Sequence, residues 1–384
     1  MPEGPRATPE DPRARSWVEV DGSALRRNLE RVREAMGPRG QVIPMVKANA
    51  YGLGVDGVVA ALEPAAPLAY GVASVNEGRH LRDLGVTRPV LLLAPTPPGS
   101  HGAAVEAGLT VSVSDLASLH LLDAAARRAG AVARFHVEVD TGLGRAGFTW
   151  SAVDAWGPEV AARHGERLRW VGCYTQLHSP DEPDPASVRE QWARFQEALD
   201  AMDLPREDFV VHVANSAGAL RLGAELPPVA RPGIFLYGGR AGQDLPRPEA
   251  VVSVRSRIAF LRDAPPGSTL GYGATHTARS HERWAALAIG YGDGLPRALG
   301  NRGEALVAGR RVPIIGRVSM DVTVVNISDL DGVVLGDVGT LVGRDGEEEI
   351  TVDEVAEHAG TIAYEIFTGL TSRLPRIWVE DGPS

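Results

Sequence analysis

The chain has 384 residues, of which 44% are hydrophobic, so it is long enough to bury the cores of two or three domains. The formal net charge is -10, with acidic residues spread along the chain, which argues against a nucleic-acid-binding protein. No apolar run approaches the roughly 20 residues of a membrane-spanning helix, and the single cysteine, Cys173, excludes an internal disulfide and is typical of the reducing cytoplasm.

The N-terminal residues 1–15 are rich in proline, arginine and glutamate and contain no apolar segment. This composition predicts a disordered leader and not a signal peptide. Residues 16–20 alternate as a short strand, and a helix is expected from about Ser23, where leucines recur at helical spacing.

Eight buried strand-like runs follow, and amphipathic stretches such as 76–84, 115–128 and 186–202 separate most of them. This alternation predicts an α/β fold, a parallel (β/α)8 barrel of the TIM type, over residues 16–245. The eight runs are residues 42–46, 68–73, 90–93, 109–113, 134–139, 168–175, 209–213 and 233–237.

The pattern changes after about residue 251, where short alternating runs are separated by glycine and aspartate turns. This pattern predicts a mainly antiparallel β domain over residues 246–384, and the strand at 16–20 is a candidate member of it. The runs are residues 253–260, 285–289, 305–307, 312–315, 322–327 and 339–342.

Lys47 is the only lysine in the chain, since 38 of the 39 basic residues are arginine. Arginine supplies charge but cannot lose a proton and attack a carbonyl, whereas the lysine amine forms Schiff bases with aldehydes such as pyridoxal phosphate. A codon-biased genome could have spared one lysine by chance. The position of Lys47 at the C-terminal end of the first barrel strand, before Gly52 and Gly54, favours a chemical role.

Chemically useful residues also end other predicted barrel strands, where active sites of this fold lie. Residues 138–145 end the fifth strand and residues 212–217 the seventh, and Arg231 opens the eighth. Asn215 and Ser216 before a short helix, together with the backbone of residues 233–234, could bind a phosphate. A single Schiff-base lysine beside a phosphate site is what a pyridoxal phosphate enzyme needs.

Eight short motifs occur in a fixed order, and each is weak alone. They are residues 46–52, 140–145, 212–217, 231–234, 272–275, 290–294, 316–321 and 364–365. In this order and spacing the chain resembles, from Trp17 to Trp378, the alanine racemase family. The resemblance implies a pyridoxal phosphate-dependent isomerase with an N-terminal barrel and a C-terminal β domain, which interconverts L- and D-alanine as a homodimer.

The resemblance also implies roles for individual residues. Lys47 would hold the cofactor and exchange a proton on one face of the substrate, and Tyr272 of the partner subunit would serve the other face. Arg231 matches the arginine that faces the pyridine nitrogen, and Arg145 the one near the phenolic oxygen and the substrate carboxylate. Phosphate-contacting positions correspond to Tyr51, Ser216, Gly233, Ile234 and Tyr364.

Three further residues belong to the second domain. Met320 and Asp321 match the loop of the partner subunit that meets the substrate carboxylate, and Tyr291 lies at the mouth of the channel that leads to the site. Without the resemblance, Tyr272 and Tyr291 would be interpreted as aromatic residues that pack against a sheet.

The chain departs from the family pattern at two supporting positions. Glu138 stands where the family often has a carbamylated lysine, and pairing of its carboxylate with Arg145 is expected. Gln176 stands where a histidine usually links the catalytic tyrosine to the pyridine-facing arginine; glutamine can bridge by hydrogen bonds but carries no charge. His178, two residues on, is the other candidate for that role. His212 and Asn215 are expected to support the site from behind.

Three alternatives remain at this stage. A racemase of the same build could act on another amino acid, such as serine. A barrel-plus-β decarboxylase is disfavoured, because that class pairs the cofactor nitrogen with a carboxylate and not with an arginine such as Arg231. A non-catalytic pyridoxal phosphate-binding protein would not need the second domain. The ten histidines show no ligand spacing, so no metal is predicted, and the pathway served stays open.

Overall fold

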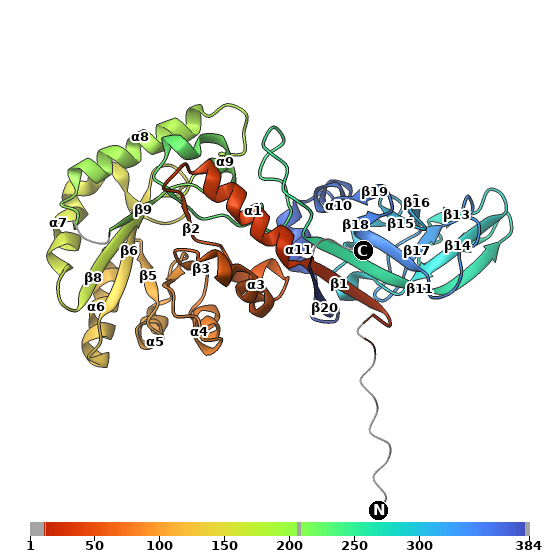
Figure 1. Ribbon diagram of the computed structural model, residues 1–384, viewed down its shortest axis with the longest axis horizontal. Helices are drawn as coiled ribbons and strands as arrows, with labels where there is room; N and C mark the ends of the chain where they lie inside the picture. The colour runs from red at the N-terminus through yellow and green to blue at the C-terminus, as the bar shows by residue number, and fades with distance from the viewer. Residues whose placement is uncertain (1–10, 12, 206–208, 381–384) are drawn as a thin grey trace, which may run out of the picture.

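The computed structural model describes residue 11 and residues 13–205 and 209–380. Figure 1 shows two halves joined through α1 (Gly22–Ala35) and β11 (Val252–Ala264): parallel strands surrounded by helices on one side, and an elongated β domain on the other.

The first half is a ring of parallel strands. In the described residues the order β3-β4-β5-β6-β8-β9 is continuous, and β10 pairs with β2. Single bridges from Met45 to Gly71 and from Asn215 to Arg231 join these two groups, so the predicted eight-stranded barrel is confirmed. Its strands are β2 (Gln41–Val42), β3 (Tyr70–Val72), β4 (Val90–Leu92), β5 (Thr110–Val113), β6 (Ala133–Asp140), β8 (Leu168–Tyr174), β9 (Val210–His212) and β10 (Val229–Ala230), and β7 (Phe148–Thr149) adds to the end of β6.

Helices cover the outside of this ring because each buries an apolar face against it, and some begin at a polar cap. Asp115 caps α6 by accepting a hydrogen bond from the Ser118 N–H at 2.6 Å, and Gly130 ends the same helix in the left-handed conformation. The helices are α3 (Val55–Leu62), α4 (Val75–Asp83), α5 (His101–Glu106), α6 (Leu116–Ala129), α7 (Val153–Arg163), α8 (Ala186–Ala201) and α9 (Ser216–Leu222).

The position predicted for the eighth strand is wrong. The run 233–237 forms a buried turn, in which the N–H groups of Leu236 and Tyr237 donate to the carbonyls of Gly233 and Ile234. The eighth strand is the shorter β10, which precedes Arg231. A buried turn and a buried strand both require apolar side chains on every face, so the pattern alone could not separate them.

The β domain is built on a nine-stranded sheet with the order β19-β18-β15-β16-β17-β14-β11-β1-β20. Strand β1 (Ser16–Asp21) lies antiparallel to β11 and parallel to β20, so both ends of the chain enter this sheet. The other elements are β12 (Thr269–Leu270), β13 (His276–Thr277), β14 (Glu282–Leu287), β15 (Glu304–Val307), β16 (Arg310–Ile315), β17 (Thr323–Asn326), β18 (Val338–Asp345), β19 (Glu348–Ile350), β20 (Arg376–Val379), α10 (Val352–Ala359) and α11 (Ala363–Gly369).

A buried ion pair fixes β1 in the sheet. The Arg255 guanidinium on β11 donates to the Glu19 carboxylate at 2.7 Å and to the Thr340 hydroxyl at 2.9 Å, and both charged side chains are about one-tenth exposed. Removal of either partner would leave an unpaired charge in the core.

The predicted leader, residues 1–15, falls largely outside the described residues. Its last residue corrects the prediction, because the Arg15 guanidinium makes two hydrogen bonds to the buried carboxylate of Asp293, at 2.7 and 2.8 Å. Over the described part of the chain, the helices are all too short or too polar to cross a membrane.

Candidate active site

Lys47 lies at the C-terminal end of the first barrel strand, as predicted. The backbone before it is hydrogen-bonded on both sides: the Met45 N–H donates to the Pro232 carbonyl, and the Val46 N–H donates to the Gly71 carbonyl. The lysine is half-buried. The rigid barrel strands therefore set the direction from which its amine reaches into the mouth of the barrel.

The residues after Lys47 form α2 (Lys47–Tyr51), whose backbone is left-handed. Ala48, Asn49, Ala50 and Tyr51 have φ values of 53, 54, 51 and 56°. For non-glycine residues this conformation costs roughly 1–2 kcal/mol each. Four successive residues of this kind next to the only lysine indicate that the surrounding structure enforces the turn for a functional reason.

Glu77 holds this turn, and sequence analysis missed it. Its carboxylate accepts hydrogen bonds from the N–H groups of Ala48 at 2.7 Å, Ala73 at 2.8 Å and Ser74 at 3.1 Å. The Ser74 side chain in turn accepts from the Glu77 N–H, which completes a capping box at the start of α4. The Ser-x-x-Glu spacing could have shown the cap, but nothing local shows that the same carboxylate holds the turn after Lys47.

The surroundings of Lys47 favour its neutral amine. Burial lowers its pKa first, the Arg145 charge lowers it further and Arg231 adds to this, while Glu77 opposes the shift. A larger fraction of the amine is therefore unprotonated near neutral pH than in an ordinary lysine, which is the form that attacks a carbonyl or accepts a proton.

Hydroxyl and backbone donors gather beside the lysine turn. The Gly233 N–H donates to the Ser216 hydroxyl at 3.0 Å, and the rings of Tyr51 and Tyr364 lie 5.9 Å apart. A Cβ at Gly233 would overlap the Tyr51 hydroxyl, so only glycine fits there. Burial raises the pKa of Tyr51 and raises that of Tyr364 to about 12. Both phenols therefore keep their protons and can donate to an anion. Ile234 is buried next to Gly233.

Arg231 is buried, and the two terminal nitrogens of its guanidinium donate hydrogen bonds to five acceptors. Burial lowers its pKa to about 10, and the nearby Tyr174 and Glu138 limit the shift, so the group stays cationic at neutral pH. Its guanidinium also lies over the Tyr174 ring, 5.2 Å from the ring centroid. The acceptors are the Thr175 carbonyl at 2.9 Å, the Gln176 side-chain oxygen at 3.1 Å, the Val213 carbonyl at 3.3 Å, and the His212 carbonyl and Nδ1 at 2.9 and 2.8 Å.

Two neutral histidines support Arg231: His212 contacts its guanidinium, and His136 contacts His212. A guanidinium only donates hydrogen bonds, so the His212 Nδ1 that it contacts carries no proton. His212 must then hold its proton on Nε2 and donate it to the His136 Nδ1 at 2.7 Å. Burial and the charge of Arg231 lower the pKa of His136 to about 3 and that of His212 well below its ordinary value. The pair fixes Arg231 in place without adding charge.

This histidine pair predicts acid sensitivity. Unfolding frees both imidazoles to take up protons near pH 6.5, their ordinary pKa, whereas the folded state resists protonation. The unfolded state thus binds more protons, and stability is lost as the pH falls below about 6.5. We expect the free energy of unfolding to be lower at pH 5.5 than at pH 7.5 by about 2–3 kcal/mol, measured by urea denaturation.

Carboxylates with ordinary pKa values near 4 take up protons below this window. The raised pKa of the buried Asp353 carboxyl would act in the opposite direction and reduce the loss of stability. The variant His281→Gln, which removes an exposed histidine, should keep the same pH dependence. A flat stability between pH 7.5 and 5.5 would show that the two buried histidines take up protons in the folded state.

The expected pair between Glu138 and Arg145 is not formed. The Glu138 carboxylate is buried and accepts a hydrogen bond from the Ser114 hydroxyl at 2.7 Å, and no ion pair joins it to Arg145 in the described part of the chain. Arg145 is exposed and follows a glycine-containing turn, and its charge acts on Lys47.

Of the two candidates beside Arg231, Gln176 makes the contact. Its side-chain oxygen accepts from the guanidinium at 3.1 Å. His178 is exposed, and its Nδ1 is hydrogen-bonded to the Ser179 hydroxyl at 2.8 Å. Asn215 caps α9 by accepting from the Gly218 N–H at 3.0 Å, which fixes the start of the helix that carries Ser216.

The remaining predicted site residues belong to the β domain. Tyr272 lies between β12 and β13, and Figure 1 shows β13 at the end of the β domain farthest from the barrel. Tyr272, Met320 and Tyr291 are 73, 52 and 42% exposed, and Asp321, which follows Met320, is exposed as well. One chain therefore carries Lys47 and the hydroxyl groups beside it in the barrel, and separate exposed side chains on the β domain.

Comparisons with known proteins agree with this arrangement. The model described as "Alanine racemase, N-terminal domain" matches residues 20–241, and "Alanine racemase, C-terminal domain" matches residues 251–378. The alanine racemase of Geobacter sulfurreducens is 38% identical over 373 residues, which is 94% of this chain and 96% of that protein.

Solved structures agree as well. That of alanine racemase from the D-cycloserine producer Streptomyces lavendulae has a TM-score of 0.89 at 32% identity, over 97% of this chain and 98% of that one. That of alanine racemase from Bartonella henselae with covalently bound pyridoxal phosphate has a TM-score of 0.86 at 26% identity, over 95% of this chain and 100% of that one.

Proposed function

Because the chain belongs to the alanine racemase family of pyridoxal phosphate-dependent isomerases, we propose that it interconverts L- and D-alanine with two bases. Lys47 is the base on one face of the substrate Cα. Tyr272 from a second copy of the chain is the base on the other. The observation that supports this most strongly is a sole lysine with a lowered pKa, set on a left-handed turn beside a site built for an anion.

The residues at the barrel mouth fit the cofactor. When bound, pyridoxal phosphate supplies an aldehyde for the lysine amine and a ring that withdraws electrons from the substrate Cα. Tyr51, Ser216, Tyr364 and the Gly233 backbone would hold its phosphate, because the two phenols keep their protons and glycine alone fits beside the Tyr51 hydroxyl.

Each of the two bases would transfer a proton on one face of the substrate Cα. Racemisation removes the Cα proton from one face and returns a proton to the other, so each direction of the reaction uses one group as base and the other as acid. The amine of Lys47 suits this role because its lowered pKa favours the neutral form, which accepts a proton. The Tyr272 phenol, on the opposite side, supplies or accepts the second proton.

Arg231 limits the reaction to proton exchange. Its cation, fixed by five acceptors and by the uncharged histidine pair, would face the cofactor nitrogen and disfavour a proton there by like-charge repulsion. A carboxylate in this place would do the opposite. The arginine thereby restrains electron withdrawal, which disfavours competing chemistry at the same carbon.

A homodimer would complete the site. Tyr272, Tyr291 and Met320 are large exposed side chains of the β domain, and a contact between copies would cover them. A second copy would bring these side chains over the barrel mouth, where Arg145 and the segment Met320–Asp321 would receive the substrate carboxylate.

The test of this function is α-proton exchange in deuterated water with a panel of amino acids. We expect the protein, loaded with pyridoxal phosphate, to racemise alanine and to exchange its Cα hydrogen faster than that of serine or larger amino acids. Faster exchange with serine would replace the proposed substrate. Cofactor binding without exchange on any amino acid would support a non-catalytic cofactor-binding protein instead.

A further inference from the structure

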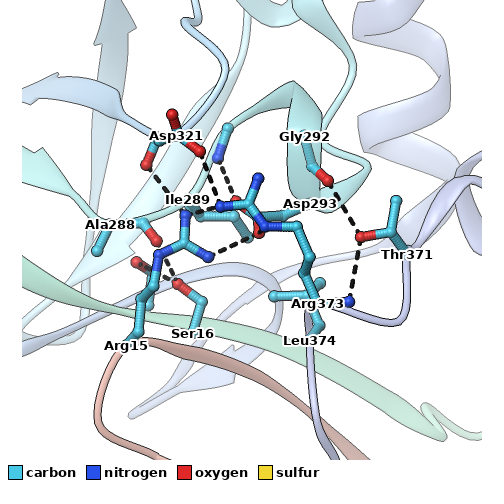
Figure 2. Close-up of polar contacts among 12 residues, drawn as sticks. Arg15, Ser16, Ala288, Ile289, Gly292, Asp293, Asp321, Thr371, Arg373 and Leu374 are labelled. Carbon is cyan, nitrogen blue, oxygen red and sulfur yellow. Dashed lines mark hydrogen bonds and ion pairs between the residues drawn. The ribbon is translucent and has the colours of Figure 1, made fainter.

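A buried carboxylate organises the surface that carries Tyr291, Met320 and Asp321. Asp293 is fully buried and ends a short turn, η5 (Tyr291–Asp293). Figure 2 shows it between two arginines that come from opposite ends of the sequence. Arg15 donates two hydrogen bonds to it, and Arg373 makes an ion pair with it at 3.4 Å.

The turn and the segment that carries Met320 form one hydrogen-bonded unit. The Tyr291 N–H donates to the Ser319 carbonyl at 3.0 Å, and the Gly292 N–H donates to the Met320 carbonyl at 2.8 Å. On the other side, the Thr371 hydroxyl donates to the Gly292 carbonyl at 3.1 Å. A change at Asp293 is therefore transmitted to both exposed side chains.

Arg373 links this buried centre to the exposed end of the unit. Besides Asp293, it donates a hydrogen bond to the Asp321 carboxylate at 2.8 Å, and Arg15 contacts the Asp321 carbonyl at 3.3 Å. The cluster holds two cations and two anions, so it is neutral as a whole. The Asp321 carboxylate is 57% exposed, and its one ion pair in the described part of the chain is with Arg373. The Arg15 charge acts on the same carboxylate, but the Arg15 guanidinium makes its carboxylate hydrogen bonds to Asp293.

We propose that Arg373 is a positioning residue for substrate binding, which holds the Asp321 carboxylate to the buried Asp293 and cancels its charge. This rests on the proposed function, in which Asp321 of one copy faces the amino acid bound in the other. An unpaired carboxylate there would repel the carboxylate that every amino-acid substrate carries. With Arg373 in place, the same segment presents a neutral, fixed surface to the substrate.

The experiment compares steady-state alanine racemisation by four variants of the full-length, cofactor-loaded protein. Arg373→Gln removes the compensating charge, and Arg373→Gln/Asp321→Asn removes the repelling charge as well. Arg373→Lys keeps a cation without the planar fork. The matched control is Arg344→Gln, which breaks an exposed ion pair with Glu349 elsewhere in the β domain.

We expect Arg373→Gln to raise the KM for alanine about tenfold while kcat stays within about twofold. The double variant and Arg373→Lys should return KM to within about threefold of the wild type, because each restores neutrality by a different route. Arg344→Gln should leave both constants unchanged.

Three outcomes would overturn the proposal. If the double variant keeps the high KM, Arg373 attracts the substrate directly or only supports the fold. If Arg373→Gln leaves KM unchanged, the charge of Asp321 does not reach the substrate, while the proposed function still stands. If the wild type does not racemise alanine, the proposed function and this inference fail together.

Discussion

Lys47→Arg is expected to abolish alanine racemisation, with kcat lower by at least ~10³. Arginine keeps the positive charge but supplies no neutral amine to bond to the cofactor aldehyde or to accept a proton. It also places a permanent cation close to Arg145 and Arg231, whose charges already act on this position. Chiral analysis of alanine after incubation measures the loss, and the visible absorbance of the bound cofactor reports whether the covalent link forms.

The control for this variant is Arg344→Lys, which adds a lysine at an exposed position of the β domain and should leave activity and absorbance unchanged. Circular dichroism separates a chemical defect from a folding defect. Activity of Lys47→Arg equal to that of the wild type would remove the basis of the proposed mechanism.

Tyr272→Phe is expected to lower kcat for racemisation by ~10²–10⁴, because one of the two proton-transfer groups is lost. The exposed position of the side chain means that the fold should not change. Lys47 remains intact in this variant, so one enantiomer of alanine should still exchange its Cα hydrogen with deuterated water without inverting. Nuclear magnetic resonance of each enantiomer distinguishes exchange from racemisation.

Mixing the two inactive variants tests whether the site is shared between copies. In a randomly reassembled mixture of Lys47→Arg and Tyr272→Phe chains, half of the dimers contain one chain of each kind, and one of their two sites has both native groups. Activity should therefore return to roughly a quarter of the wild-type value. Each variant alone, taken through the same reassembly, should stay inactive. No recovery in the mixture would mean that Lys47 and Tyr272 act within one chain.

The sequence was sufficient for most of the barrel because its strands are buried apolar runs between amphipathic helices. It failed at residues 233–237, where the apolar run is a buried turn. It also gave no sign of the left-handed turn after Lys47, because Ala48, Asn49, Ala50 and Tyr51 include no glycine that would mark a positive φ.

Candidate site residues could be identified only where the signal lies in a short stretch of the sequence. Lys47 was visible as a unique residue, and Gly233 and Ser216 as a phosphate-binding pattern. Two contacts depended on distant residues: Glu138 accepts from Ser114 in place of Arg145, and Arg15, in a segment with the composition of a disordered leader, binds Asp293. Neither the spacing nor the composition of a segment reports a partner so far along the chain.

The pairing of β1 between β11 and β20 sets the order in which a newly made chain can be completed. Strand β1 is made before the other strands, yet Val20 pairs with Val252 and Asp21 with Val379, so both of its neighbours are made only after the whole barrel. The barrel can close earlier, because its strands pair with one another. The β sheet is therefore completed after the barrel, and a chain truncated before β20 exposes an unpaired edge of β1 that invites aggregation.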